Sequence, residues 1–555
     1  AQDISEPHLM AHAATYLPKY MLPSFLMRME ALPVSANGKV DESKLPAPVA
    51  AQVDDTALSL TAETLLRIFR SVLEQDEIYG NSDYFLCGGN SLNALESIIE
   101  IEKQLGKKVR VADLYACRTA IRLAALLDGE PVSAFTAGKH TVAQASLQKA
   151  PKRAEYPLSP IQQGIYVQSV LDPNGLSYNM PGAFRLEKEP DVARLEKAFA
   201  SLIRHDPIFR TVFVQGSDGI CARVLENVDF TLEELCADNF ENACAEFLRP
   251  FDLSSAPLLR AALWQSKEGE YYLFVDSHHI IGDGMTTPIV LQRLDRAYAG
   301  QTDAIEWDYY DHIYTAQQAG AEEKKQELRY WTEHLQELPQ SLMLPTDFPR
   351  QRRFDFKGAE LEYSLSEADS VACREFCREN GYSEYMLFLA AYGILLSAVS
   401  GSKDMLIGTP VAGRNHVQSA DICGPFINTL PLRLKPEAGL TVHQWLDRIR
   451  DEVTGMLDHQ RVDLEQIISA LDLPRAEQNA LYRVMLTQSP VDESKFALDG
   501  NRMCFRAIPT GTVKMDMILE LAQKEKCYVL RFSYASSLFQ KETIAFYGRC
   551  MGQLA

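Results

Sequence analysis

The chain has 555 residues, of which 46% are apolar and 23% charged, so it has the composition of ordinary globular protein and the length for several folding units. A formal net charge of -20 argues against a nucleic acid as partner. No apolar run is long enough to span a membrane, and the first residues, AQDISEPHLM, lack the pattern of a signal peptide.

Residues 1–50 predict a small α+β unit. His8–Tyr16 reads as a short helix, and a strand-like run, Ser24–Leu32, follows a proline-rich stretch. The Asn-Gly pair that comes next is a strong turn signal, so Lys39 lies on an exposed loop. On its own such a lysine is simply a solvated side chain.

Residues 57–130 contain two amphipathic helix patterns joined by a polar loop. The first begins near Ala57–Ala62, with Thr61 as the predicted N-cap. Its apolar face carries Leu65, Ile68, Phe69 and Val72. The second helix follows Ser91, directly behind a Gly-Gly-Asn sequence. A serine there is either a plain N-cap or an exposed hydroxyl beside backbone N–H groups that suit a phosphate.

A linker is predicted for residues 131–153, which are rich in Ala, Ser, Thr and Lys and lack sustained periodicity. We expect it to lie partly ordered against its neighbours.

Two apolar runs in the next segment predict a β-hairpin. They are Leu258–Gln265 and the start of Tyr271–Gly284, separated by a Lys-Glu-Gly turn. The second run delivers His278 and His279 into a turn closed by Asp-Gly. Because adjacent strand residues point to opposite faces, only one imidazole can face a given cleft. A buried histidine is usually a satisfied core residue, but histidine also exchanges protons near neutral pH.

Eleven scattered cysteines, without a CxxC pair, favour reduced thiols in a cytoplasm over disulfides or zinc, and we expect no metal. Cys373 and Cys377 have helical spacing and are expected in a core.

The N-terminal motifs resemble parts of nonribosomal peptide synthetases. LPKYMLP (17–23) and LPVSANGKVD (32–41) are similar to the last part of an adenylation domain, residues 1–50 here. The resemblance implies that Lys39 contacts the acyl-adenylate during activation. Since the adenylation core with its ATP site is missing, we expect no adenylation by this chain alone.

The sequence DYFLCGGNSL (83–92) resembles the attachment site of peptidyl carrier proteins, with Asn90 where Asp or His is often found. The resemblance implies a helical bundle over residues 57–130, of four helices in that family. It also implies that Ser91 carries a covalent 4′-phosphopantetheine, added by a phosphopantetheinyl transferase. The thiol of this group would hold an amino acid or peptide as a thioester.

Residues 154–555 resemble a condensation domain. The HHxxxDG signature at the end of the hairpin is shared with epimerisation domains and chloramphenicol acetyltransferases. Further motifs in the expected order are LSPIQQGIY (158–166), RHD and RTVF (204–213), YYD (309–311), IGTPVAGR (407–414) and GPFINT (424–429). The last two favour condensation over epimerisation, and the neighbouring carrier serine argues against a drug acetyltransferase.

The implied fold is two α/β lobes, each like chloramphenicol acetyltransferase, with a tunnel between them. By resemblance, His279 faces the tunnel and orients the acceptor amine or takes its proton. His278 is expected to be structural. Asp283 is expected to pair with Arg414, and Gly284 to leave space beside the reacting carbonyl.

The order of the parts implies that the carrier supplies the donor and that a downstream carrier brings the acceptor amine. The alternatives are a docking fragment that delivers its carrier to a tailoring enzyme, and transfer to a soluble amine. We expect a cytoplasmic monomer.

Overall fold

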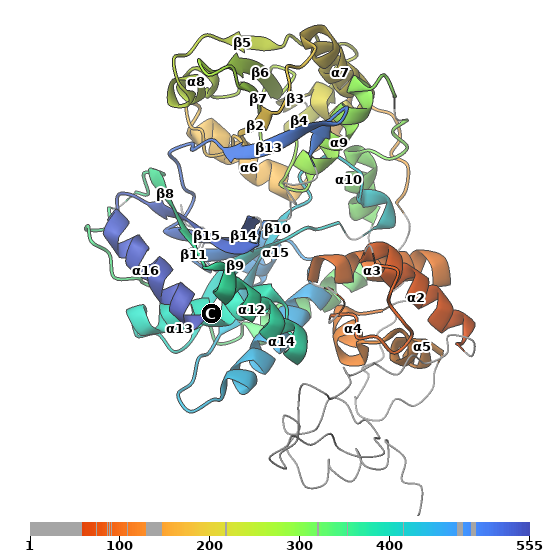
Figure 1. Cartoon of the computed structure of the whole chain (residues 1–555), viewed down its shortest axis with the longest axis vertical. Coiled ribbons are helices and arrows are strands. Elements are labelled where there is room, and N and C mark those ends of the chain that lie inside the picture. Colours follow the sequence, from red (N-terminus) through yellow and green to blue (C-terminus); the bar gives the residue numbers. More distant parts are fainter. Residues whose placement is uncertain are drawn as a thin grey trace, which may run out of the picture.

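The computed structural model describes residues 58–128 and 147–555, apart from short gaps at 74, 86, 88, 90, 108, 217–218, 303, 319–320, 352, 415, 474–480, 490–495 and 525. Lys39 and the unit predicted for residues 1–50 lie outside the described residues. Figure 1 shows a small helical bundle beside two larger α/β lobes, one above the other.

The bundle consists of four helices, as predicted. They are α2 (Leu60–Val72), α3 (Ser91–Leu105), α4 (Val111–Cys117) and α5 (Ala120–Asp128). Its core is apolar, with Leu65, Phe69 and Leu123 fully buried. Burial of these amphipathic faces against one another stabilises helices that are too short to persist alone.

The predicted N-cap of the first helix was wrong. Ser59 caps α2, and its Oγ accepts the Ala62 N–H at 3.1 Å. The Thr61 hydroxyl instead donates to Asp128 at 2.8 Å, which ties the first helix to the last. Ser59 and Thr61 lie two residues apart in this stretch, and either side chain can cap a helix, which left the capping residue ambiguous.

The loop before α3 is held against a buried tyrosine. The Gly89 N–H donates to the Tyr84 carbonyl at 2.9 Å, and a Cβ at position 89 would overlap the Tyr84 ring. The Tyr84 hydroxyl lies 2.9 Å from Ser97 Oγ, so the ring is fixed from both ends. Close packing therefore requires glycine at this position of the Gly-Gly-Asn-Ser sequence.

The first lobe is built on a six-stranded sheet of order β12-β13-β2-β7-β6-β5. Its strands are β2 (Gly182–Leu186), β5 (Glu233–Leu235), β6 (Leu259–Gln265), β7 (Tyr271–Ser277), β12 (Ala497–Leu498) and β13 (Asn501–Ala507). A separate three-stranded sheet contains β1 (Glu155–Pro157), β3 (Thr211–Gly216) and β4 (Gly219–Val224). The helices of this lobe are α6 (Pro160–Leu171), α7 (Val192–His205), η4 (Pro207–Arg210), α8 (Phe240–Phe247), α9 (Thr286–Tyr298) and α10 (Tyr309–Gln318).

The second lobe has a six-stranded sheet of order β10-β9-β11-β14-β15-β8. Its strands are β8 (Gly358–Ser364), β9 (Met405–Val411), β10 (Asn428–Leu434), β11 (Val484–Gln488), β14 (Met517–Lys524) and β15 (Cys527–Ala535). Its helices are α11 (Ala321–His334), α12 (Glu367–Asn380), α13 (Glu384–Ser400), η5 (Val417–Ser419), α14 (Val442–Asp458), α15 (Leu464–Ala470) and α16 (Lys541–Leu554).

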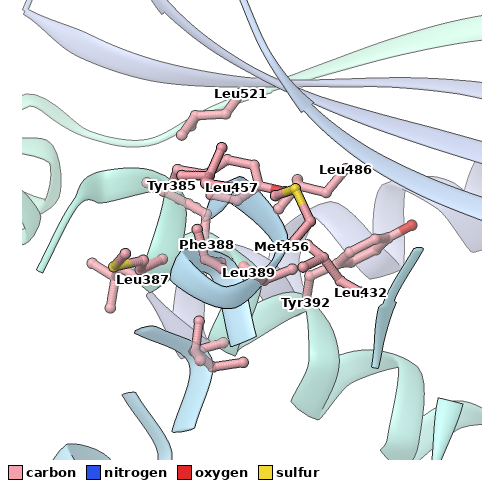
Figure 2. Packing of buried hydrophobic residues seen from close by; sticks show 14 of the residues in the cluster. Tyr385, Leu387, Phe388, Leu389, Tyr392, Leu432, Met456, Leu457, Leu486 and Leu521 are labelled. Atoms are coloured by element: carbon pink, nitrogen blue, oxygen red, sulfur yellow. The ribbon is translucent and has the colours of Figure 1, made fainter. Parts of the chain in front are cut away.

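Helix α13 forms the centre of the second core. It is apolar on nearly every face, and Figure 2 shows Phe388 and Tyr392 packed with Leu432 of β10, Leu486 of β11 and Met456 of α14. A helix that is apolar all round is expected only where other elements surround it. Cys373 and Cys377 of α12 are buried in the same core, as predicted.

The chain crosses back between the lobes near its C-terminal end. Strand β13 follows the second-lobe strands in sequence, yet it pairs with β2 in the first lobe, with Met503 opposite Leu186 and Ala507 opposite Gly182. The next strand, β14, lies in the second sheet. The segment between β13 and β14 therefore runs from one lobe to the other.

The end of the predicted linker belongs to the first lobe. Leu147 is buried in its core, and the Ala150 N–H donates to Asp311 at 2.7 Å. Lys149 makes an ion pair with the same carboxylate at 2.9 Å. These contacts hold the described end of the predicted linker, residues 147–153, against the first lobe.

The bundle packs on the second lobe through α4 and α14 (Figure 1). At this contact, burial raises the pKa of Asp458 to about 6, while Arg110 and a hydrogen bond from the Val111 backbone oppose the rise. Arg118 lies so close to Gly381 that a side chain at position 381 would overlap its guanidinium.

Within the described residues, none of the single helices has the length and apolar content to cross a membrane. The bent pair α12 and α13 passes that test jointly, with an angle of 109° between them.

Candidate functional site

The predicted hairpin is present and ends at the histidine pair. Strands β6 and β7 are antiparallel, with Leu259 opposite Ser277 and Gln265 opposite Tyr271. The chain then turns sharply and enters α9 at Thr286. His278, His279, Asp283 and Gly284 therefore lie in one connection between a central strand and a helix.

His278 is buried and hydrogen-bonded, as expected of a structural residue. It is 4% exposed, its Nδ1 accepts the Ile280 N–H at 3.2 Å, and its Nε2 lies 3.4 Å from the Ser169 hydroxyl. Burial lowers the pKa of His278 to about 3, helped by the charges of His279, Lys514 and Arg260. The imidazole is therefore neutral at any physiological pH.

His279 is half-buried and differently placed. Its backbone N–H donates to the Tyr178 carbonyl at 2.8 Å, but its buried Nδ1 has no hydrogen-bond partner within the described part of the chain. Burial lowers its pKa to about 4; the charge of Lys514 adds to the effect and Asp283 opposes it. An uncharged imidazole with an unused nitrogen can accept a hydrogen bond from a substrate.

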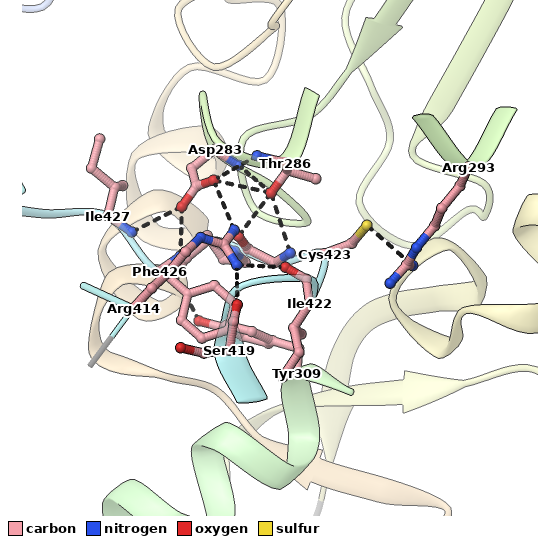
Figure 3. Close-up of polar contacts among 12 residues, drawn as sticks. Asp283, Thr286, Arg293, Tyr309, Arg414, Ser419, Ile422, Cys423, Phe426 and Ile427 are labelled. Atoms are coloured by element: carbon pink, nitrogen blue, oxygen red, sulfur yellow. Dashed lines mark hydrogen bonds and ion pairs between the residues drawn. The ribbon is translucent and has the colours of Figure 1, made fainter. Parts of the chain in front are cut away.

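Asp283 is saturated with hydrogen bonds, as Figure 3 shows. One carboxylate oxygen accepts the N–H groups of Phe426 and Ile427 at 2.9 and 3.1 Å, and the other accepts the Thr286 N–H at 3.0 Å. The predicted pair with Arg414 is present, with Nη2 to Oδ1 at 3.4 Å.

Arg414 extends this network into the second half of the chain. Its Nη1 donates to the carbonyls of Ser419 and Ile422 at 2.6 and 2.7 Å, and its guanidinium lies 4.3 Å from the centroid of the Phe426 ring. Asp283 is 1% exposed and Arg414 9%. A buried pair that is this well hydrogen-bonded fixes the shape of the turn.

Two further motifs converge on the same turn. Gln162, which is fully buried in α6, donates to the Ile280 carbonyl at 3.0 Å. The Tyr309 hydroxyl of α10 lies 2.8 Å from the Pro425 carbonyl and 3.0 Å from Ser159 Oγ. The SPIQ, YYD and GPFIN stretches thus support the histidine turn from behind.

A second polar cluster lies under His278. Asp276 is fully buried, accepts from Asn179 at 2.7 Å and pairs with Arg260 at 3.2 Å. Burial raises the pKa of Asp276 to about 6 against the opposing effects of these two partners. Arg260 stacks on Phe251, which borders a cavity of about 260 Å³ and whose ring lies 6.0 Å from that of His278.

Ser91 lies in the helical bundle, at the first residue of α3. Helix α3 contacts η5, the short helix that follows Arg414 in sequence. The N–H groups at the start of a 15-residue helix point toward its N-terminus and suit an anion, and Gly89 brings the preceding loop close against Tyr84. This backbone fits a phosphate ester on Ser91.

The matches to known protein families divide the chain into the same carrier and condensation parts that the sequence motifs predict. Residues 152–551 match the family model described as condensation domain, and residues 63–127 match the one described as phosphopantetheine attachment site. The chain belongs to the condensation-domain family. The resemblance to nonribosomal peptide synthetases is thereby confirmed for the carrier and condensation parts.

Relatives in bacterial synthetases extend over nearly the whole chain. Surfactin synthase subunit 2 of Bacillus subtilis (strain 168) is 34% identical over 98% of this chain, and gramicidin S synthase 2 of Brevibacillus brevis is 30% identical over 98%. The chain spans only 15% and 12% of the length of these two proteins.

Solved structures share the fold of the condensation part of the chain. The X-domain from teicoplanin biosynthesis has a TM-score of 0.65 at 21% identity, covering 74% of this chain and 96% of that one. The first condensation domain of the CDA synthetase has a TM-score of 0.63 at 18% identity, covering 72% and 96%. The predicted fold class is therefore confirmed for the carrier and condensation parts, while the tunnel stays a prediction.

Sequence reasoning missed three residues around the histidines. Gln162 lies inside the SPIQ motif, but its hydrogen bond to the turn carries no signal in the sequence. Tyr178 and Lys514 lie in irregular segments, and no pattern marks either of them. Tyr178 reaches His279 through pairing within the first lobe, where the neighbouring Asn179 lies opposite His278, whereas Lys514 comes near it only because the chain crosses between the lobes.

Proposed function

We propose that this chain forms amide bonds between two carrier-bound substrates. The donor is an acyl group held as a thioester on the 4′-phosphopantetheine of Ser91, and the acceptor is an amine on a downstream carrier. The amine attacks the thioester carbonyl, a C–N bond forms, the C–S bond breaks, and the thiol leaves with the proton that the nitrogen loses. The arm on Ser91 supplies the activated thioester, so the domain itself provides placement and proton handling.

The observation that carries this proposal is the HHxxxDG turn with its uncharged His279, in the same chain as a carrier domain. The turn is braced by groups from both halves of the chain, through Asp283, Arg414 and Phe426. Bracing of this kind suits a reaction that depends on holding two reactants in one geometry.

On this proposal, His279 orients the acceptor amine more than it deprotonates it. A general base works best when its pKa lies near the working pH, whereas the pKa of His279 is lowered to about 4. At neutral pH the imidazole is uncharged and keeps one N–H, so its other nitrogen can accept a hydrogen bond from the nitrogen nucleophile. The imidazole would bind the proton that the nucleophile loses only transiently.

The remaining site residues have supporting roles. His278 anchors the end of β7, and the Asp283–Arg414 pair keeps the turn in shape. Gly284, which is exposed, leaves space on the substrate side of the turn. The lack of a side chain matters there because the thioester carbonyl must come close to the backbone.

The partners follow from the chemistry. A phosphopantetheinyl transferase must modify Ser91, an adenylation core must select and load the donor, and a downstream carrier must present the acceptor. We place the protein in a reducing cytoplasm as a monomer, consistent with eleven free cysteines.

The test starts from the unmodified chain, coenzyme A and a phosphopantetheinyl transferase. Intact-protein mass spectrometry should show the addition of one phosphopantetheine, mapped to Ser91 and absent in Ser91→Ala. The donor-loaded chain is then offered a loaded acceptor carrier or a free amine. Modification elsewhere than at Ser91, or transfer only to the free amine, would contradict the proposal.

A further inference from the structure

The segment that runs between the lobes places a lysine beside the histidine turn. Lys514 lies in this segment and is fixed from both sides. On one side the Val513 N–H donates to the Phe356 carbonyl at 2.9 Å, and on the other the Asp516 N–H donates to the Arg483 carbonyl at 3.1 Å. Both anchors belong to the second lobe, so the backbone at Lys514 is set before any substrate enters.

The Lys514 side chain reaches across to the first lobe. Its ammonium lies 4.0 Å from the centroid of the Tyr178 ring, a cation–π contact. The Tyr178 carbonyl is the acceptor for the His279 N–H, and the Tyr178 ring centroid lies 6.4 Å from that of His279. No carboxylate of the described residues forms an ion pair with Lys514, so its charge is not neutralised locally.

The net charge around the imidazoles of His278 and His279 is therefore positive. The groups that face them are Lys514, Arg260, Asp283 and Tyr178. Arg260 is paired with Asp276, and the Asp283 carboxylate is already taken up by Arg414 and three backbone N–H groups.

Lys514 keeps its charge at neutral pH. Burial lowers its pKa only to about 8, and burial raises the pKa of Tyr178 to about 12, so the tyrosine stays neutral. The positive charge of Lys514 acts on both His278 and His279. A fixed cation in a partly buried site makes every second cation there costly.

We propose that Lys514 is a positioning residue of the condensation site, whose unpaired ammonium over Tyr178 excludes a second cation and so keeps His279 and the incoming acceptor amine uncharged. This inference rests on the proposed function. An amine attacks a carbonyl only in its unprotonated form, and an imidazole accepts a hydrogen bond only when it is neutral. A single fixed charge therefore favours the reactive state of both groups.

The test compares Lys514→Met and Lys514→Gln with Lys514→Arg, which keeps the charge. The midpoint of the His279 titration is measured by NMR on the unloaded, ¹³C-histidine-labelled chain, with His279→Asn for assignment. Lys526→Met is the matched control, because Lys526 is an exposed lysine paired with Glu367. The same variants are then assayed for amide formation between loaded carriers across pH.

We expect the His279 midpoint to lie near pH 4 in the wild type and in Lys514→Arg, and to rise in the two neutral variants while staying below 6.5, because burial remains the larger cause of the lowered pKa. The rate at about pH 6, relative to that at about pH 8, should be lower in the neutral variants than in the wild type. Lys526→Met should change neither quantity.

Several results would overturn the inference. A wild-type midpoint near 6.5, or a midpoint that stays in place in both neutral variants, removes the electrostatic role. If Lys514→Arg shifts the His279 midpoint as Lys514→Met does, the shift comes from the shape of the side chain and not from its charge. Because the titration needs no loaded substrate, a chain that shifts as predicted but makes no amide would refute the proposed function and leave the charge effect standing.

Discussion

Asp283 and His279 lie four residues apart in one turn, yet their surroundings are opposite. The carboxylate of Asp283 accepts three backbone N–H groups and pairs with Arg414. The buried Nδ1 of His279 has no partner among the described residues, and the nearby charge of Lys514 has no counter-ion among them. Buried polar groups are normally satisfied, so the unpartnered Nδ1 of His279 differs clearly from the saturated carboxylate of Asp283, and we propose that substrate binds on the His279 side of the turn.

The comparison predicts that the two sides fail in different ways when they are altered. Changes on the Asp283 side should lower the free energy of unfolding, because they leave buried groups without partners. Changes on the His279 side should lower the rate of amide formation and leave the fold intact.

His279→Ala should have the largest effect. We expect the single-turnover rate of amide formation between loaded carriers to fall by about 10²–10⁴-fold, since the group that orients the nucleophile is lost. His205→Ala is a control, because His205 is exposed on α7 and, among the described residues, hydrogen-bonds to Ser201 of its own helix alone. A rate within a few-fold of wild type would remove His279 from the mechanism.

Asp283→Ala should destabilise the fold by about 3–5 kcal/mol, because Arg414 would remain buried without its counter-ion. Urea unfolding followed by tryptophan fluorescence measures this. Glu155→Ala breaks an exposed ion pair with Arg223 and should change the midpoint little. A well-folded Asp283→Ala protein with the wild-type midpoint would show that the network does not hold the turn.

Gly424→Ala probes how tightly the second half of the chain packs on the turn. A Cβ at this position would overlap the ring of Tyr309, which is 1% exposed, so we expect a loss of about 1–3 kcal/mol. Gly164→Ala is the matched control, since nothing lies near its Cβ and alanine favours the α6 helix. Equal stability of the two variants would contradict the packing.

Thr286→Val tests the hydrogen bonds rather than the volume. The Thr286 hydroxyl accepts the N–H groups of Asp283 and Gly424 at 3.1 and 3.3 Å, and the loss of this acceptor should cost about 1–3 kcal/mol. Thr332→Val, which loses one bond near the surface, should be nearly neutral. Unfolding curves of both variants measure this loss of stability. A Thr286→Val protein as stable as the wild type would argue against the saturated network.

The smallest effect concerns pH. Burial lowers the pKa of His312 to about 3, and the ring lies 4.5 Å from that of Phe426. Because this value lies below the ordinary 6.5, the unfolded chain binds the proton more tightly below that pH, and stability falls as the pH falls through this range. Replacing the imidazole in His312→Asn should reduce the loss of stability between about pH 7 and 5.5 by about 1 kcal/mol. Parallel pH curves for the two proteins would show that His312 is not buried as a neutral group.

The sequence was sufficient for the parts of the site that follow from local pattern. The hairpin, the turn at its end and the Asp283–Arg414 pair follow from strand periodicity and motif resemblance, and the structure confirms them. The cap of α2 was placed at Thr61 instead of Ser59, since either side chain can cap a helix and only the tertiary contact with Asp128 decides between them.

Lys514 was beyond prediction for a different reason. Its place beside His279 depends on the crossing of the chain from β13 to β14, which brings residues more than 200 positions apart into one site. The sequence around Lys514 has the pattern of an ordinary loop. The electrostatic surroundings of His279 therefore depend partly on a group that only the three-dimensional arrangement brings near it.

The most direct measurement follows the acyl group itself. The chain is loaded with a donor on Ser91 and mixed with a loaded acceptor carrier, and the intact mass of both proteins is recorded over a single turnover. We predict that the donor mass leaves this chain and appears on the acceptor carrier as an amide. Release of the donor only as the free acid, with no gain in mass on the acceptor carrier, would contradict the proposed function.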